Sequence, residues 1–335
     1  MSLTKVFILD VDDKFNNNLF PIIINDREII NSEIVEYDVD RVLRSQYSLE
    51  FVLHRMFSSH PCRHENYSDS DVVVIPIYLF LSAWKTKYFY DVMEVVKCVQ
   101  EIQDKVDGIT KDGKKVLLFY SDVMWEDQRC FLNYFEFDPN VFFVCYEDVL
   151  SSNKQIPVPF CTHIKSNPVK YHIPNKLNKT HLISYVGRYR PETELFENIN
   201  QFNTDKVKDD RWISINDQNL YEEIDQIYLN SYFSLQPHGD KKSRKGFYHS
   251  LLMGCVPVVF EDNYQIYKKI FEGLVNLQDI CIVLSFDDKD RYTEILLGEI
   301  QNIPDKITNI EKIKHLLLYD ETDTSIVDYI LNHMN

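Results

Sequence analysis

Residues 231–264 hold the densest group of chemically useful side chains in this sequence. They read SYFSLQPHGDKKSRKGFYHSLLMGCVPVVFEDNY, and four of the five residues 241–245 are basic, although the whole chain has a formal net charge of −16. An apolar run that predicts a strand ends at Leu235, and a helical pattern begins close to Ser243. Free amides in the first turn of that helix, and its dipole, would favour a phosphate, to which Arg244 could add a bidentate contact. A basic run is more often a solvated loop, but the strand pattern GCVPVVF that follows places this one at the carboxyl edge of a parallel sheet, where α/β proteins bind ligands.

Two series of alternating strand and helix patterns could position this loop. In the first, continuous apolar runs typical of strands in a parallel sheet alternate with stretches of helical spacing. These elements are expected at 47–57, 72–78, 91–106, 115–120 and 141–145. Residues 165–179 are rich in Pro, Asn and Lys and predict a linker, after which the strand and helix patterns restart at residue 181. The sequence therefore predicts two parallel α/β domains followed by a helical tail.

Composition excludes several classes of protein. The chain has 335 residues, of which 44% are hydrophobic and 26% charged, the ordinary balance of a globular protein. The net charge of −16 argues against a nucleic-acid partner or an anionic lipid surface. No apolar run approaches the roughly 20 residues of a transmembrane segment, and the start of the chain resembles neither a signal peptide nor an anchor. Seven cysteines without a CxxC pair suit a reducing compartment, so we expect a cytoplasmic protein.

The stretch SLQPHGDKKSRKGFYHSLLMGCVPVVF resembles the signature of the exostosin-like glycosyltransferases, family 47. It is most similar to the pattern CLQPxGDSxTRRxxFDSxLxGCIPVFF of the plant xyloglucan galactosyltransferase branch. Four further segments resemble the family in the same order. They are VFILDVDDKFN, LHRMFSSHPCRHENYSDSDVVVIPIY, IPVPFCTHIKSNP and ISYVGRYRP. These matches cover most of the chain and identify it as a member of the family.

The resemblance implies a GT-B fold, in which two Rossmann-like domains face each other across a cleft. It places an acceptor-side domain at 1–168, a nucleotide-sugar-binding domain at 179–305 and a C-terminal helical tail at 306–335. The implied reaction is inverting transfer of a galactose- or xylose-class sugar from a UDP-sugar to a hydroxyl of a glycan acceptor. Two alternatives stay open: a catalytically inactive glycan-binding subunit, and a GT-B transferase with a non-uridine donor. Some members are anchored in the Golgi, so the Golgi lumen is the alternative location if the sequence belongs to a longer chain.

The resemblance also implies the donor site. Gly187 and Arg190 match the family's AGxxRP turn, where the glycine permits close approach and the arginine can reach a diphosphate. Asp240 matches a GD pair, and Ser243 and Arg244 match a TR pair. The predicted donor-binding residues are Gly187, Arg188, Arg190, His238, Asp240, Ser243, Arg244, Lys245, His249 and Glu261.

One position departs from the family. His249 stands five residues before Gly254, where the family has an acid and where GT-B enzymes place a ribose-binding carboxylate. An imidazole can still bond a ribose hydroxyl, although a neutral one has a single acceptor nitrogen. This departure leaves the nucleotide preference open.

Inverting transfer needs a general base within hydrogen-bond reach of the acceptor hydroxyl. Such a group should lie at the carboxyl end of a strand in the first domain. Asp122 is our first candidate and His163 the second. Other acids at such positions are Asp12, Asp13, Glu147 and Asp148.

No metal or other cofactor is expected, because the basic residues and helix amides can neutralise the leaving diphosphate. Asp69-Ser70-Asp71 is formally a DxD motif, but it precedes a predicted strand and so lies at the wrong end for a sugar-nucleotide metal. The acidic residues 287–290 predict a solvated loop. The neighbouring histidines 54, 60 and 64 share no helical or strand face and predict no metal site.

Overall fold

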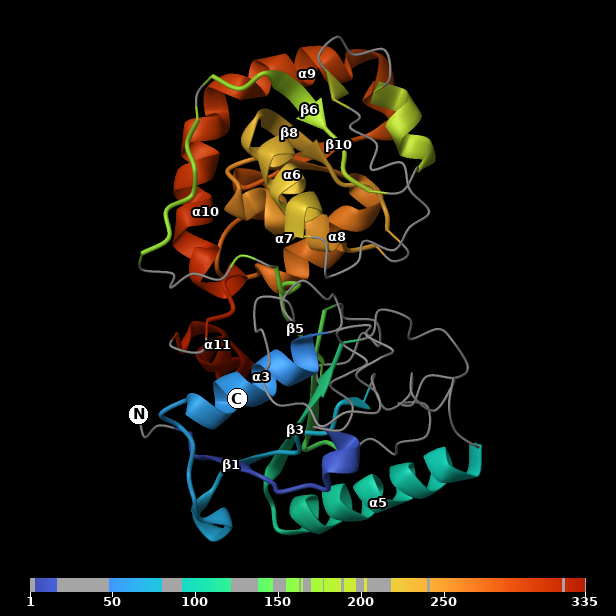
Figure 1. The fold of residues 1–335 in the computed structure, drawn as a ribbon, viewed down its shortest axis with the longest axis vertical. Helices are drawn as coiled ribbons and strands as arrows, with labels where there is room; N and C mark the ends of the chain where they lie inside the picture. Colours follow the sequence, from blue (N-terminus) through green and yellow to red (C-terminus); the bar gives the residue numbers. More distant parts are fainter. Residues whose placement is uncertain are drawn as a thin grey trace. The chain divides into compact units, whose positions relative to one another are not determined.

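The computed structural model describes most of the chain, in two compact units. The described residues are 4–16, 48–79, 92–121, 138–146, 155–162, 164, 170–176, 178–187, 190–196, 202–203, 218–239, 242–320 and 323–334. Unit 1 comprises Met1–Lys165 and Tyr319–Asn335, and unit 2 comprises Ser166–Leu318. Each unit contains one five-stranded parallel sheet with helices packed against it (Figure 1).

The sheet of unit 1 has the strand order β1-β2-β3-β4-β5, and all its neighbours are parallel. The strands are β1 (Val6–Ile8), β2 (Val72–Val74), β3 (Lys115–Tyr120), β4 (Val141–Cys145) and β5 (Gln155–Pro157). Every residue of β2, β4 and β5 is buried, and the sequences of β2 and β4 are continuous apolar runs for that reason. The helices α3 (Leu49–Ser59) and α5 (Val92–Lys111) both contact β3. The 3-10 turn η1 (Asp13–Phe15) follows β1, and the 3-10 turn η4 (Tyr67–Asp69) precedes β2.

The C-terminal helix α11 (Ser325–His333) belongs to unit 1, where it lies beside α3 (Figure 1). The Tyr319 hydroxyl donates to the Pro159 carbonyl at 2.6 Å, and Lys115 Nζ donates to the Met334 carbonyl at 2.6 Å. The preceding helix α10 (Ile303–Leu317) belongs instead to unit 2. The segment 306–335, expected as one tail, is therefore divided, because each helix buries its own apolar face in a different unit.

The sheet of unit 2 has the strand order β10-β9-β8-β6-β7, again all parallel. Its strands are β6 (His181–Ser184), β7 (Phe202–Asn203), β8 (Ser231–Leu235), β9 (Val256–Phe260) and β10 (Ile282–Leu284). The chain runs from β6 to β7 on one side and then continues with β8 on the other side of β6. This is the strand order of a doubly wound Rossmann-like sheet. Successive strands are added in one direction from β6 to β7 and in the opposite direction from β8 onward, so the order reverses between β6 and β8. The predicted fold class, an α/β protein with one parallel sheet in each of two units and C-terminal helices, is confirmed. The GT-B arrangement of the two units stays a prediction.

Helices and 3-10 turns alternate with these strands. They are η6 (Pro191–Phe196), α6 (Gln218–Leu229), α7 (Lys245–Leu252), α8 (Glu261–Ile270), η7 (Leu277–Asp279), η8 (Phe286–Arg291), α9 (Tyr292–Glu299) and η9 (Ile300–Asn302). Among the described residues no helix is both long and apolar enough to cross a membrane. Five described cysteines are buried with free thiols.

Two expected elements differ from the structure. The strand expected over 72–78 ends at Val74, because Pro76 has no N–H with which to continue a ladder. Part of the expected linker is packed rather than free, since the Tyr171 hydroxyl donates to the Leu252 carbonyl at 2.7 Å and the Ile173 N–H donates to Glu311 at 2.6 Å. Residues 170–176 are therefore an ordered part of unit 2.

The turn between α7 and β9 depends on Gly254. This residue has φ +64°, and a Cβ there would run into the carbonyl oxygen of Pro174. We expect Gly254→Ala to destabilise the protein by more than about 2 kcal/mol, because the backbone conformation and the clash both disfavour a side chain. Urea denaturation measures the effect.

Gly298 supplies the matched control. It lies in α9 with no atom within 4 Å of a built Cβ, so Gly298→Ala should stabilise the protein by roughly 0.5–1 kcal/mol. Equal midpoints for the two variants would contradict the role given to Gly254.

Candidate anion-binding site

The site lies at the reversal point of the sheet in unit 2. The carboxyl end of β6 leads into Gly187, and the carboxyl end of the adjacent β8 leads through Gln236 into the basic loop before α7. In doubly wound sheets, ligands bind in the crevice that opens between such diverging loops. The topology therefore brings together two sequence segments that stand about fifty residues apart, as the resemblance implies.

Arg244 is held at the start of α7 by contacts on three sides. Its main-chain N–H donates to the Tyr267 hydroxyl at 2.9 Å, and its Nη2 donates to the Val186 carbonyl at 3.0 Å. The guanidinium carbon lies 5.1 Å from the centre of the Tyr185 ring, a cation–π distance. The other terminal nitrogen, Nη1, is buried and has no hydrogen-bond partner. A half-buried guanidinium with one buried, unpaired nitrogen is a candidate site for an anion, because leaving those N–H donors unpaired costs stability.

Gly187 makes this position of Arg244 possible. It has φ +150°, and a Cβ there would clash with the Arg244 guanidinium and approach the Tyr185 hydroxyl to 3.0 Å. Only glycine combines that backbone conformation with such a close approach. The structure thus brings together Gly187 and Arg244, two of the predicted site residues.

Two buried polar side chains lie at the carboxyl ends of the adjacent strands β6 and β8. The side-chain oxygens of Ser184 and Gln236 are both buried without a hydrogen-bond partner. Gln236 is fixed through its backbone, because its N–H donates to the Val258 carbonyl at 2.8 Å and its carbonyl accepts from Asn263 at 3.0 Å. Gly246 leaves room for it, since a Cβ there would lie 2.9 Å from Gln236 Oε1. Sequence reasoning missed Ser184 and Gln236, although their positions at carboxyl strand ends were a usable signal.

Other predicted donor-site residues lie on the same edge of this sheet. His238 Nε2 lies 2.7 Å from Oδ2 of Asp262, which is in the first turn of α8. Glu261 is the first residue of α8, and its side chain is exposed. Ser243 is buried just before α7, and Lys245 is the first residue of that helix. Their contacts with a donor remain predictions.

His249 is paired inside the unit. Its Nε2 lies 2.6 Å from Asp225 Oδ1 on α6, and its ring meets the Tyr228 ring edge-on at 5.1 Å between centroids. Its side chain is 6% exposed, whereas that of Asp225 is 26% exposed. The histidine therefore has a carboxylate partner from a neighbouring helix, and its predicted contact with a ribose remains a prediction.

Several predicted residues lie outside the described part of the chain. They are Arg188, Asp240, Asp122, His163, Glu147 and Asp148. Arg190 is described just before η6, where its carbonyl accepts the Thr193 N–H at 2.9 Å.

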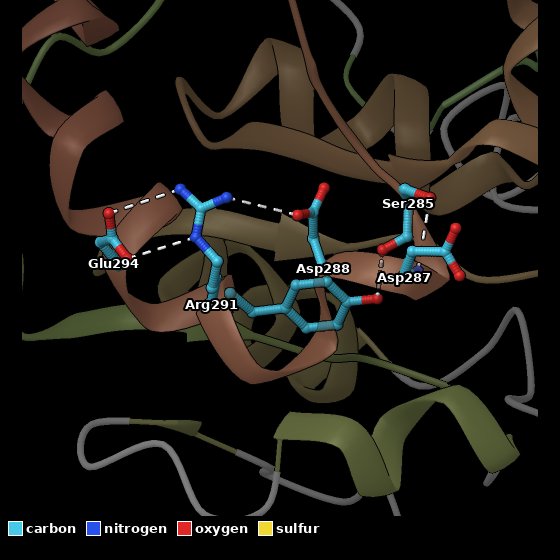
Figure 2. Close-up of polar contacts among 6 residues, drawn as sticks. Ser285, Asp287, Asp288, Arg291 and Glu294 are labelled. Atoms are coloured by element: carbon cyan, nitrogen blue, oxygen red, sulfur yellow. Dashed lines mark hydrogen bonds and ion pairs between the residues drawn. The ribbon is translucent and has the colours of Figure 1, made fainter.

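The rival acidic motifs have local partners. Asp71 accepts the Lys5 N–H at 2.8 Å and Asp69 accepts from the Asn66 amide at 3.1 Å, both before β2 as the sequence predicts. Residues 287–290 form part of the exposed turn η8, where the Arg291 guanidinium lies 3.5 Å from Asp288 and 3.4 Å from Glu294 (Figure 2). Within the described ranges, no three His, Cys, Asp or Glu side chains group together as metal ligands would.

Comparison with known proteins assigns the chain to a class. Residues 1–285 match the exostosin GT47 domain. The chain belongs to the exostosin GT47 family, as its motifs predict.

The relatives are distant. Xyloglucan-specific galacturonosyltransferase 1 of Arabidopsis thaliana is 26% identical over 245 residues, which are 66% of this chain and 36% of that protein. A probable xyloglucan galactosyltransferase of the same plant, GT15, is 23% identical over 305 residues, 81% of this chain and 63% of that protein. The chain thus spans less than two thirds of the length of either relative.

Solved structures are more distant still. The lipopolysaccharide outer core galactosyltransferase WaaB aligns over 98% of this chain and 99% of its own, with 10% identity and a TM-score of 0.38. TarM aligns over 85% of this chain and 57% of its own, with 10% identity and a TM-score of 0.31. Scores this low carry no weight for the fold, which is defined by the two sheets.

The pairing of His249 with Asp225 generates a prediction. His249→Asp would place two carboxylates together where one side chain is almost fully buried, so we expect a loss of roughly 2 kcal/mol in the free energy of unfolding. Adding Asp225→Asn should restore most of that loss, because it removes the repulsion. Chemical denaturation of the two single variants and the double variant measures the coupling, and a double variant no more stable than His249→Asp would show that the pair does not interact.

Proposed function

We propose that this protein is an inverting glycosyltransferase that moves a sugar from a UDP-sugar to a hydroxyl of a glycan acceptor. The observation that supports it most is Arg244, whose buried and unpartnered Nη1 lies at the reversal point of a Rossmann-like sheet. Membership of the exostosin GT47 family supports the same reaction class.

The described residues suggest how the leaving group is stabilised. In the transfer, the acceptor oxygen forms a bond to the sugar C1 while the bond from C1 to the diphosphate oxygen breaks. The electron pair of that bond leaves with the nucleoside diphosphate, and the acceptor proton passes to a general base. Arg244 and the first amides of α7 would bind the diphosphate and gain strength as its charge develops. Because Val186 and Tyr185 already hold the guanidinium, little reorganisation is needed at that moment.

The proposed substrates follow from the family branch. Relatives are named as galacturonosyl- and galactosyltransferases of xyloglucan, so we propose a galactose- or xylose-class donor and a xyloglucan-type glycan acceptor. Asp122 and, second, His163 remain the proposed general bases. The leaving diphosphate is proposed to be neutralised by side chains and amides rather than by a metal ion.

The role of Arg244 can be tested with two variants. Arg244→Ala should lower turnover with UDP-galactose and xyloglucan oligosaccharides on the order of 10²-fold, because a charge-assisted contact to the leaving group is lost. Arg244→Lys should recover only part of the rate. An ammonium group is a single compact donor, so it cannot bond the Val186 carbonyl and also offer a bidentate pair of N–H groups to the diphosphate. Thermal unfolding checks that both variants are folded. If Arg244→Ala transfers sugar at the parent rate, the proposed anion-binding role of Arg244 is wrong.

Metal independence has its own test. We expect transfer to persist in EDTA, because in the proposed site Arg244 and the first amides of α7 would neutralise the diphosphate without a metal ion. Loss of activity in EDTA that manganese restores would contradict this and return attention to Asp69 and Asp71.

A further inference from the structure

Unit 1 carries a buried polar pair that the donor site does not use. Glu50, the second residue of α3, is 0% exposed. Its Oε1 accepts the main-chain N–H of Ser121, the first residue after β3, at 3.2 Å. Ser121 is 1% exposed, and its hydroxyl has no hydrogen-bond partner.

Both groups are costly to bury. A carboxylate taken out of water needs compensation, which Glu50 receives from the Ser121 N–H and from its place in the first turn of a helix. The Ser121 hydroxyl receives no such compensation. A buried hydroxyl without a partner is rare enough in folded proteins to need a reason, and a ligand that completes the bond is one.

The position of Ser121 indicates the kind of ligand. It follows the central strand of the sheet order β1-β2-β3-β4-β5, at the carboxyl edge where parallel sheets bind ligands. Thr162, five residues after β5, has a second buried hydroxyl without a partner at the same edge. Serine and threonine hydroxyls both donate and accept, so they match the hydroxyls of a sugar.

The imidazole of His54 is not the group that compensates the buried Glu50 carboxylate. His54 lies one turn after Glu50 on α3, and burial, followed by the charge of Arg63, lowers the pKa of His54 to about 4. Its Nδ1 lies 3.1 Å from the Tyr78 hydroxyl. The imidazole is therefore neutral near pH 7 and engaged with Tyr78, so it does not neutralise the Glu50 carboxylate.

We propose that Ser121 binds a hydroxyl of the glycan acceptor and that Glu50 is the positioning residue that holds the Ser121 peptide for this contact. The inference rests on the proposed function and adds two acceptor-side residues to it.

The test separates acceptor binding from donor chemistry. Ser121→Ala removes a hydroxyl that bonds nothing in the protein, so the variant should fold like the parent. Its KM for xyloglucan oligosaccharides should rise about 10-fold, while hydrolysis of UDP-galactose without acceptor stays at the parent rate. Glu50→Ala should lower transfer on the order of 10²-fold with donor hydrolysis retained, and Glu50→Gln, whose carbonyl can still accept the N–H, should recover at least 10-fold of that loss.

Glu311→Gln is the matched control. Glu311 is also a helix carboxylate that accepts a distant main-chain N–H, but in unit 2, so its variant should transfer sugar with the parent's acceptor KM. If Ser121→Ala keeps the parent's acceptor KM, or if Glu50→Ala loses donor hydrolysis and transfer together, the proposal is wrong. If Glu50→Ala does not fold, the acceptor KM of Ser121→Ala alone decides whether the proposal holds. A parent protein that neither binds nor hydrolyses a nucleotide-sugar would instead overturn the proposed function.

Discussion

The close approach of Arg244 to the main chain at Gly187 is the constraint on which the rest of the site depends. A guanidinium can bond the Val186 carbonyl and cover the Tyr185 ring only if the next residue has no side chain in its way. This fixes the relation between the β6 and β8 loops, because one loop supplies the carbonyl and the ring while the other supplies the cation. The Tyr267 hydroxyl accepts the Arg244 main-chain N–H and so also fixes the start of α7. The first helix amides and the guanidinium are therefore positioned together.

Each unit has unsatisfied buried polar atoms at the carboxyl edge of its parallel sheet. In unit 2 they include side-chain atoms of Ser184, Gln236 and Arg244, and in unit 1 they include the hydroxyls of Ser121 and Thr162. Stability alone would select apolar residues there, because an unpaired buried polar group costs free energy that packing does not return. Their location at the ligand-binding edge of both sheets is the pattern expected when a site is built for partners that come from solution.

The fold was predictable because its signals are strong and local. Buried parallel strands appear as apolar runs such as Lys115–Tyr120 and Val141–Cys145, and both are strands with those bounds. The division of the tail between α10 and α11 was not predictable, because two amphipathic helices look alike until the surfaces that cover them are known. Gly187 and Arg244 came from the family motif, whereas Glu50 lies in the first turn of a helix and was missed by a search for acids at strand ends. The pairing of His249 with Asp225 joins two helices and has no signal in either sequence segment.

The structure also distinguishes the cationic residues of the basic loop at 241–245 from one another. In the sequence it stands out by charge, with four cations in five positions, and any of them could serve an anion equally well. In the structure the described members differ in burial: Lys242 is exposed, whereas Lys245 and Arg244 are half-buried. The Arg244 main chain is held by the Tyr267 hydroxyl and its side chain by the Val186 carbonyl. An exposed lysine contributes mainly a screened, adjustable charge. A guanidinium can bond a carbonyl with one nitrogen, cover an aromatic ring with its plane and keep further N–H groups for a ligand. We therefore expect the shape of the Arg244 side chain to set the selectivity of the proposed site. The neighbouring charges would raise the local concentration of anions around an otherwise acidic protein.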